Sequence, residues 1–225
     1  MNMKNAPRID TKLRKHTIFV PEVYREASGI IINGKRIKSL IFSTDVAVIA
    51  NCNGDAVIAV YPFTPTLQIA SAIISVAQRP VFVGVGGGTT YGDRVESIAL
   101  DAELHGATAI VLNAPTKTEF VRELVEKIDI PVVLTVVSLD ENLKERMYET
   151  KADIINVSGG KNTVDIVKKI REIDKDFPII ATGGPTEETV AQVIHAGANA
   201  VTFTPPSNGE IFKELMEDYR QRCKK

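Results

Sequence analysis

The sequence is short of the residues that build disulfide frameworks and metal sites. Its 225 residues include two cysteines, three histidines and no tryptophan. Two cysteines cannot make a disulfide framework, so the sequence predicts a reducing compartment. With so few histidines and cysteines, a His-rich metal site, a Cys–His pair and a Ser–His–Asp triad are all poorly supported, and we expect no bound metal.

An excess of one charge and a long apolar run are also missing. The formal net charge is -1, which gives no overall electrostatic reason to bind nucleic acid or a membrane surface. No apolar run reaches the roughly 18 residues of a membrane helix, and the N-terminus lacks the apolar core of a signal peptide. We therefore expect a cytoplasmic protein with a small-molecule partner, and neither a nucleic-acid nor a membrane partner.

An internal repeat is the most informative pattern that is present. One type of short apolar segment recurs four times, and a second type that begins with proline recurs three times. The segments are residues 54–60, 106–112, 151–157 and 197–203 for the first type, and 80–83, 131–134 and 178–181 for the second. The two types alternate, and residues 39–43 stand where a fourth member of the second type belongs. The repeat predicts eight strands, each followed by helical spacing, as in residues 120–128 and, after the last strand, 211–219.

Eight strands that alternate with helices predict a single (β/α)8 TIM barrel. Strands that are apolar on both faces are typical of a parallel sheet covered by helices. An open doubly wound sheet is the alternative, but a four-fold repeat favours a closed ring. Residues 1–39 form an extension with a β-hairpin around Asn33-Gly34 that we expect to pack on the barrel bottom. Residues 40–225 form the barrel, with short loops.

Glycine pairs at two strand ends point to anion binding. In barrel enzymes the active site lies at the carboxyl ends of the strands. Ser158-Gly159-Gly160 and Thr182-Gly183-Gly184 both stand at such ends and open directly onto helices. Glycine loops and helix N-termini present backbone N–H groups to anions, and Lys161 adds a full positive charge. The alternative is that the glycines only make tight turns.

The same region carries a family resemblance. Residues 180–189 and 196–201 resemble the phosphate-binding (β/α)8 superfamily of ribulose-phosphate-binding and aldolase-type barrels, well over strands six to eight and loosely elsewhere. The resemblance implies that a substrate phosphate is held after strands seven and eight, often with help from strand six. After strand eight, however, this chain has two prolines, which lack N–H groups. The phosphate contacts would then come from Ser207 and Asn208, or lie nearer Gly159 and Gly160.

The candidates for proton transfer and substrate orientation are few. Asp45 is the only carboxylate immediately at a strand end, so it is either a general acid or base or simply a helix N-cap. Asn113, Asn156 and Tyr61 could bind a substrate carbonyl or hydroxyl, or only finish the top layer of the barrel. The loop at residues 84–92, with Gly86 and Gly87, is either a flexible loop or a close backbone approach to substrate.

Together these patterns predict an enzyme that acts on a small phosphorylated metabolite by isomerase, epimerase or lyase chemistry. The chain also resembles a poorly characterised family of compact barrels labelled only "hydrolase", so a hydrolase is the first alternative. No cofactor is expected, although FMN could use the same glycine loops, and a non-catalytic metabolite-binding barrel stays open. A homo-oligomer is also open, but no single surface patch of the sequence stands out.

Overall fold

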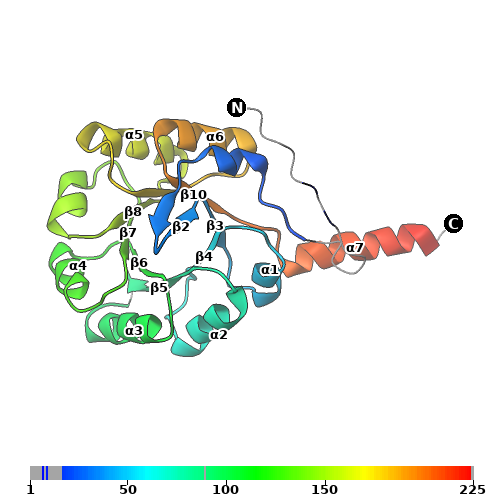
Figure 1. The fold of residues 1–225 in the computed structure, drawn as a ribbon, viewed down its shortest axis with the longest axis horizontal. Helices are drawn as coiled ribbons and strands as arrows, with labels where there is room; N and C mark the ends of the chain where they lie inside the picture. The colour runs from blue at the N-terminus through cyan, green and yellow to red at the C-terminus, as the bar shows by residue number, and fades with distance from the viewer. Residues whose placement is uncertain (1–6, 8, 10–16, 89, 224–225) are drawn as a thin grey trace.

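The computed structural model describes residues 7, 9, 17–88 and 90–223, and its core is a closed barrel of eight parallel strands (Figure 1). Around the ring the order is β10-β3-β4-β5-β6-β7-β8-β9, so each strand lies beside its neighbour in sequence and the last closes on the first. The strands are β3 (Ser39–Phe42), β4 (Ala56–Ala59), β5 (Val81–Gly87), β6 (Ala109–Asn113), β7 (Val132–Val136), β8 (Ile154–Val157), β9 (Ile179–Thr182) and β10 (Ala200–Phe203). The prediction of a TIM barrel is confirmed, and the open sheet is excluded.

Helical segments connect the strands on the outside of the ring. The α-helices before the last strand are α1 (Val46–Ala50), α2 (Leu67–Ala77), α3 (Asp93–Leu104), α4 (Thr118–Val125), α5 (Thr163–Ile173) and α6 (Glu187–Ala196). A single π-helical turn, η2 (Glu145–Glu149), stands between β7 and β8, and a 3-10 turn, η3 (Gly160–Asn162), precedes α5. No helix in the described part of the chain is both long and apolar enough to cross a membrane.

The barrel buries two separate apolar layers, because successive strand residues point to opposite faces. The inner layer fills the ring and includes Leu40, Ile58 and Phe82. The outer layer lies between the strands and the helices and includes Ile41 and Val201, both fully buried. Strands with both faces buried require continuous apolar runs, and this requirement is why the sequence repeat is so plain.

A two-stranded hairpin closes the end of the barrel at which the strands begin. β1 (Ile30–Ile32) pairs antiparallel with β2 (Lys35–Ile37), and Asn33 and Gly34 form the turn, both with positive φ. Ile37 is buried in the inner layer, and Ile30 and Ile32 pack against it. The predicted hairpin is therefore present. The division of the chain into residues 1–39 and 40–225 stays a prediction.

The segment before the hairpin covers the outer face of β10 and β3, where the eighth helix of a barrel would lie. Ile18 bridges to Cys52, just after α1. Further along, Tyr24 of the 3-10 helix η1 (Glu22–Glu26) is buried, donates a hydrogen bond to the Thr202 carbonyl at 3.3 Å, and packs edge-on against Phe203. In Figure 1 this dark blue segment runs from α1 to α6. We call residues 18–27 the strap.

The last helix does not pack on its own barrel. The apolar spacing of residues 211–219 predicts a helix that helps to cover the sheet, and α7 (Asn208–Cys223) does form there. Yet none of its residues, all of which the structure describes, is buried. Figure 1 shows α7 extending away from the ring beside α1. The expectation that this helix covers the sheet is wrong, because the strap already occupies the surface that it would cover.

Candidate active site at the barrel mouth

The strand ends give the barrel mouth one polar side and one apolar side. On five successive strands, the residue two positions after an inner-layer residue is a neutral polar one, and it faces inward by alternation. The polar side consists of Asn113, Thr135, Asn156, Thr182 and Thr202, from β6 to β10. The corresponding residues of β3, β4 and β5 are Phe42, Val60 and Gly84. The mouth therefore presents hydrogen-bonding groups on one side and mainly apolar groups on the other.

Hydrogen bonds link part of this polar side. The Asn156 amide nitrogen donates to the Thr135 hydroxyl at 3.2 Å, and the Thr182 hydroxyl donates to the Ser158 hydroxyl at 3.5 Å. The Asn156 side-chain oxygen Oδ1 is buried and accepts no hydrogen bond from the described residues. A buried acceptor without a donor is costly, at about 1–3 kcal/mol. Asn156 thus offers an acceptor to a ligand with an N–H or O–H group.

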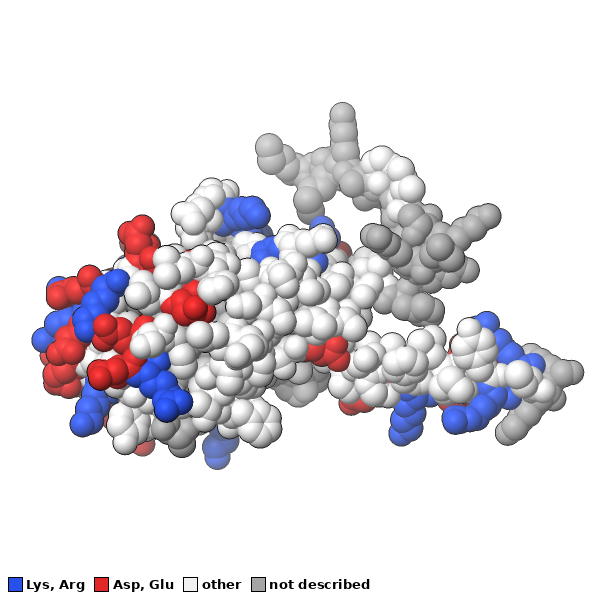
Figure 2. Space-filling view, turned by 90° about the horizontal axis from the view of Figure 1, so that it is seen from below, with Lys and Arg blue, Asp and Glu red and all other residues white. Residues whose placement is uncertain are grey.

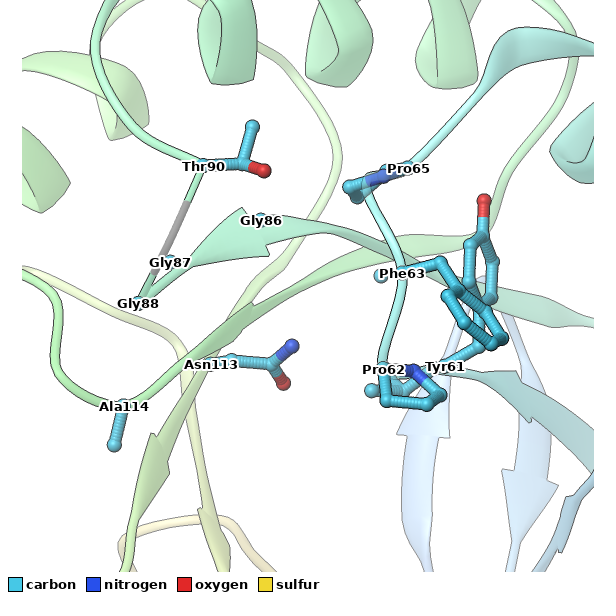
Figure 3. A pocket seen from close by; sticks show the side chains of 12 residues that line it. Tyr61, Pro62, Phe63, Pro65, Gly86, Gly87, Gly88, Thr90, Asn113 and Ala114 are labelled. Carbon is cyan, nitrogen blue, oxygen red and sulfur yellow. The ribbon is translucent and has the colours of Figure 1, made fainter.

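Two cavities open beside Asn113. The larger, about 580 Å³, is lined by residues that include Phe42, Asp45 and Tyr61. The smaller, about 200 Å³, lies between β5 and the loop at residues 61–65. Figure 3 shows the Asn113 amide directed from β6 into this space. The larger cavity falls in the range of about 300–1,000 Å³ that is typical of small-molecule sites.

Asp45 both caps a helix and lines the larger cavity. Its Oδ1 accepts hydrogen bonds from the amides of Ala47 at 2.9 Å and Val48 at 3.1 Å, so it is the N-cap of α1. It is half-buried and is the only carboxylate among the residues that line the two cavities. The structure therefore gives the capping role directly, and the role in proton transfer stays a prediction.

Tyr61 lines both cavities, but its hydroxyl has a local partner. It accepts a hydrogen bond from the Thr66 amide at 3.0 Å, just before α2. Tyr61 therefore braces the loop at residues 61–65, and a role in binding substrate stays a prediction.

The two glycine pairs have structural reasons of their own. A Cβ at Gly159 would lie 2.4 Å from the Ile166 side chain, and one at Gly183 would lie 2.7 Å from that of Val201. Gly160 and Gly184 have φ of 58° and 77°, which glycine adopts at little cost. Only at Gly160 would a Cβ meet open space. The tight-turn alternative is thus supported, and it leaves the backbone of Gly160 accessible beside the exposed Lys161.

The loop after β10 is engaged by its own helix. Glu210 accepts hydrogen bonds from the Ser207 hydroxyl at 2.7 Å and the Ser207 amide at 2.8 Å, and these bonds hold the pKa of Glu210 below its ordinary value. A carboxylate at this amide would repel a phosphate, and the next residue, Asn208, is the exposed first residue of α7. Of the two predicted locations for a phosphate, the one nearer Gly159 and Gly160 is therefore favoured.

The glycine-rich stretch after residue 84 continues a strand. β5 extends through Gly87, four residues beyond the predicted segment at residues 80–83, with a register shift between Gly84 and Gly86. A Cβ at Gly87 would lie 2.1 Å from the Asn113 carbonyl oxygen. Gly87 thus lets β5 approach β6 closely, and this backbone contact explains the glycine without a substrate. Thr89 lies outside the described residues.

Sequence reasoning missed Thr135 and Thr202 in the polar side of the mouth. Counting two residues on from each inner-layer residue would have found both. Among the described residues, no group of three or more His, Cys, Asp or Glu side chains is arranged to hold a metal ion.

Comparison with known proteins identifies the fold. No protein-family model and no curated protein matches the sequence. A solved mandelate oxidase is 16% identical with a TM-score of 0.64, and the match covers 79% of this chain and 68% of that one. A 2,3-dimethylmalate lyase, described as a PEP mutase/isocitrate lyase superfamily member, is 15% identical with a TM-score of 0.56, covering 90% and 85%. A phosphonopyruvate hydrolase is 16% identical with a TM-score of 0.59, covering 85% and 94%. The chain therefore shares the TIM-barrel fold of these enzymes.

Proposed function

We propose that this chain is an enzyme that acts on a small phosphorylated metabolite by isomerase, epimerase or lyase chemistry. The observation that carries the proposal is the two-sided barrel mouth, in which neutral polar side chains end five successive strands and one of them, Asn113, lines a cavity of about 580 Å³. A barrel that only had to be stable would gain by filling those positions with apolar side chains. The buried, unpaired Oδ1 of Asn156 points the same way. Structurally similar barrels include a lyase, a synthase, a phosphonomutase and a hydrolase.

The residues at the mouth suit chemistry that begins by removing a proton beside a carbonyl group. Asp45 would take the proton from the carbon. Both of its capping hydrogen bonds go to Oδ1, so Oδ2 is the oxygen for proton transfer. The amide group of Asn113 would donate a hydrogen bond to the carbonyl oxygen as it gains negative charge, and the free Oδ1 of Asn156 would accept one from a substrate hydroxyl. Return of the proton to the other face or to the next carbon completes an epimerisation or an isomerisation.

The phosphate would lie by the loops after β8 and β9. Gly160 offers backbone without a side chain, and Lys161 offers a positive charge that is exposed to solvent. The N-terminus of α5, which follows directly, adds partial positive charge. Ser158 and Thr182, whose hydroxyls are 3.5 Å apart, would complete the contacts with Gly183 and Gly184.

A flavin is less well matched to this mouth. Reduced flavins are tuned by charge near the ring nitrogens. Of the described residues that line the two cavities, none is a lysine or an arginine. A purified protein that is yellow would nevertheless favour FMN over the proposed function.

Ligand binding tests the first half of the proposal. Thermal denaturation would be followed with a panel of sugar phosphates and phosphorylated three-carbon acids, each beside its unphosphorylated counterpart. Stabilisation follows mass action, about 2.7 kcal/mol at a ligand concentration of 100 times Kd. We expect the phosphorylated members to stabilise more strongly. Lys161→Gln should weaken that effect, whereas Lys168→Gln, also exposed but on α5, should not. Equal effects of both ligand series would contradict phosphate binding.

Hydrogen exchange tests the second half. A ligand that stabilises the protein would be incubated with it in D₂O, and NMR would report deuterium at the carbon beside the carbonyl. Asp45→Asn keeps a good N-cap but removes the base, so exchange should fall by about 10²–10⁴-fold with little change in stability. Full exchange in Asp45→Asn would overturn the assignment. Release of inorganic phosphate without exchange would favour the hydrolase alternative.

A further inference from the structure

The C-terminal helix presents an apolar stripe that its own barrel leaves uncovered. In α7, Phe212 and Tyr219 are each 60% exposed and Met216 is 45% exposed. With Ile211 and Leu215 they follow the spacing of one helix face. Most of the charged residues lie on the other side, where Arg220 pairs with Glu217. Arg222, which pairs with Asp218, comes seven residues after Leu215 and ends the stripe. An amphipathic helix of this kind gains stability only when another surface covers its apolar face.

The strap prevents α7 from docking where a barrel's eighth helix docks. Residues 18–27 cover β10 and β3, and Tyr24 fixes the strap there through its contacts with Thr202 and Phe203. The outer-layer residues Ile41 and Val201 are fully buried, although no residue of α7 is buried. The surface that covers α7 therefore lies elsewhere.

A matching surface exists beside the start of α7. From Ala56 to Gln78 the sequence has no charged residue, and α1 has none either. On these two helices Val46, Leu67 and Ile69 are each 39% exposed. Figure 2 shows the side of the molecule that carries α2 as mostly white, between the charged helices at one end and α7 at the other. We call the exposed sides of α1 and α2 the neutral face.

We propose that two copies of this chain form a symmetric dimer in which α7 of each copy packs its apolar stripe on the neutral face of the other. Figure 1 shows α7 starting beside α1 and pointing away from the ring, so its apolar stripe is placed to contact another molecule. Because both surfaces belong to one chain, a two-fold axis satisfies both at once. A helix of 16 residues is about 24 Å long and about 10 Å wide. Two such helices would bury about 1,000 Å² in total, the lower limit for a specific interface.

Sedimentation or light scattering of the full chain tests the dimer. We expect a species of twice the 24.5 kDa chain mass. Phe212→Glu should raise the dimer dissociation constant roughly thirtyfold or more, as loss of a buried aromatic anchor does. Glu214→Lys, on the opposite side of α7, should leave the dimer unchanged. A monomeric wild-type protein, or a Phe212→Glu variant that dimerises normally, would overturn the proposal.

The neutral face needs its own variant. Ile69→Glu on α2 should weaken the dimer as Phe212→Glu does, whereas Leu100→Glu, at a residue 44% exposed on α3, should not. If Phe212→Glu is monomeric but Ile69→Glu remains dimeric, α7 packs on some other surface and the assignment fails. All four variants change exposed side chains, and thermal melts would confirm that each one folds.

Mixing the two disruptive variants gives the sharpest result. In a reciprocal dimer, the Phe212→Glu copy still offers an intact neutral face, and the Ile69→Glu copy still offers an intact α7. One of the two contacts survives, so the mixture should form heterodimers although neither variant forms homodimers. If the α7 helices instead paired with each other, mixing would restore nothing, and that outcome would refute the proposed arrangement.

Discussion

A buried tyrosine, Tyr24, holds the strap on the barrel. Its hydroxyl should make the barrel less stable at alkaline pH. Tyr24 is 4% exposed, and burial raises the pKa of its phenol from 10.0 to about 12. The folded chain therefore keeps the proton in a pH range where the unfolded chain has lost it. Stability from this group is fully present below pH 10 and falls as the pH rises toward 12. In Tyr24→Phe the contribution is absent at every pH.

The size of the effect follows from the two pKa values. Between them, the free energy of unfolding falls by about 1.36 kcal/mol for each pH unit. With pKa values of 10.0 and about 12, Tyr24 accounts for a loss of about 1.4 kcal/mol by pH 11 and about 2.7 kcal/mol in total. At pH 8, Tyr24→Phe loses only the 3.3 Å hydrogen bond to the Thr202 carbonyl, which costs about 0.5–1.5 kcal/mol.

Urea denaturation at pH 8 and pH 11 measures both quantities. The fall in unfolding free energy between these pH values should be about 1.4 kcal/mol smaller in Tyr24→Phe than in the wild type. Lysines and other tyrosines titrate in both proteins, so the difference between the two falls isolates Tyr24. Tyr91→Phe, at a residue 76% exposed, is the control and should behave like the wild type. Equal falls in unfolding free energy for Tyr24→Phe and the wild type would refute the burial of the Tyr24 hydroxyl between the strap and the barrel.

Two further predictions concern the glycines and the cysteines. Gly183→Ala places a Cβ 2.7 Å from Val201 and 2.8 Å from Val190 and should destabilise the barrel by about 1–3 kcal/mol. At Gly209 in α7 a Cβ would meet open space, so Gly209→Ala should be neutral or stabilising by up to about 1 kcal/mol. Equal urea midpoints for the two variants would contradict the packing described around Gly183. Cys52 is buried and burial raises the pKa of its thiol, whereas Cys223 is exposed. A thiol reagent should therefore label Cys223 quickly and Cys52 only on unfolding. Rapid labelling of both cysteines would show that the strap opens readily.

The fold class could be predicted from the sequence because it depends on local patterns. Each barrel strand has both faces buried, so each appears as a separate apolar run, and the run recurs in every quarter of the chain. The hairpin turn at Asn33 and Gly34 is likewise local, since both residues adopt positive φ.

The candidate site could be predicted only in part. The position of Asp45 at a strand end follows from the sequence, but only the structure shows that its carboxylate accepts hydrogen bonds from the amides of Ala47 and Val48. Gly87 looked like a loop glycine, because a close contact with the next strand leaves no mark in the sequence near residue 87. Thr135 and Thr202 were missed because threonine is common in strands, and only the inner layer below them shows which way they face.

The sequence alone determines that eight strands alternate with helices and that residues 211–219 form an amphipathic helix, because both properties arise between neighbours along the chain. Only the tertiary structure decides what covers each apolar face. Two apolar segments, one from each end of the chain, could cover the outside of β10 and β3. The strap covers it, and Tyr24 makes the contacts with Thr202 and Phe203. Which of the two segments covers the surface depends on shape and packing between residues far apart in the chain. The spacing of apolar residues along the sequence does not show this. The position of the strap leaves α7 uncovered, and from that exposed helix we infer the dimer.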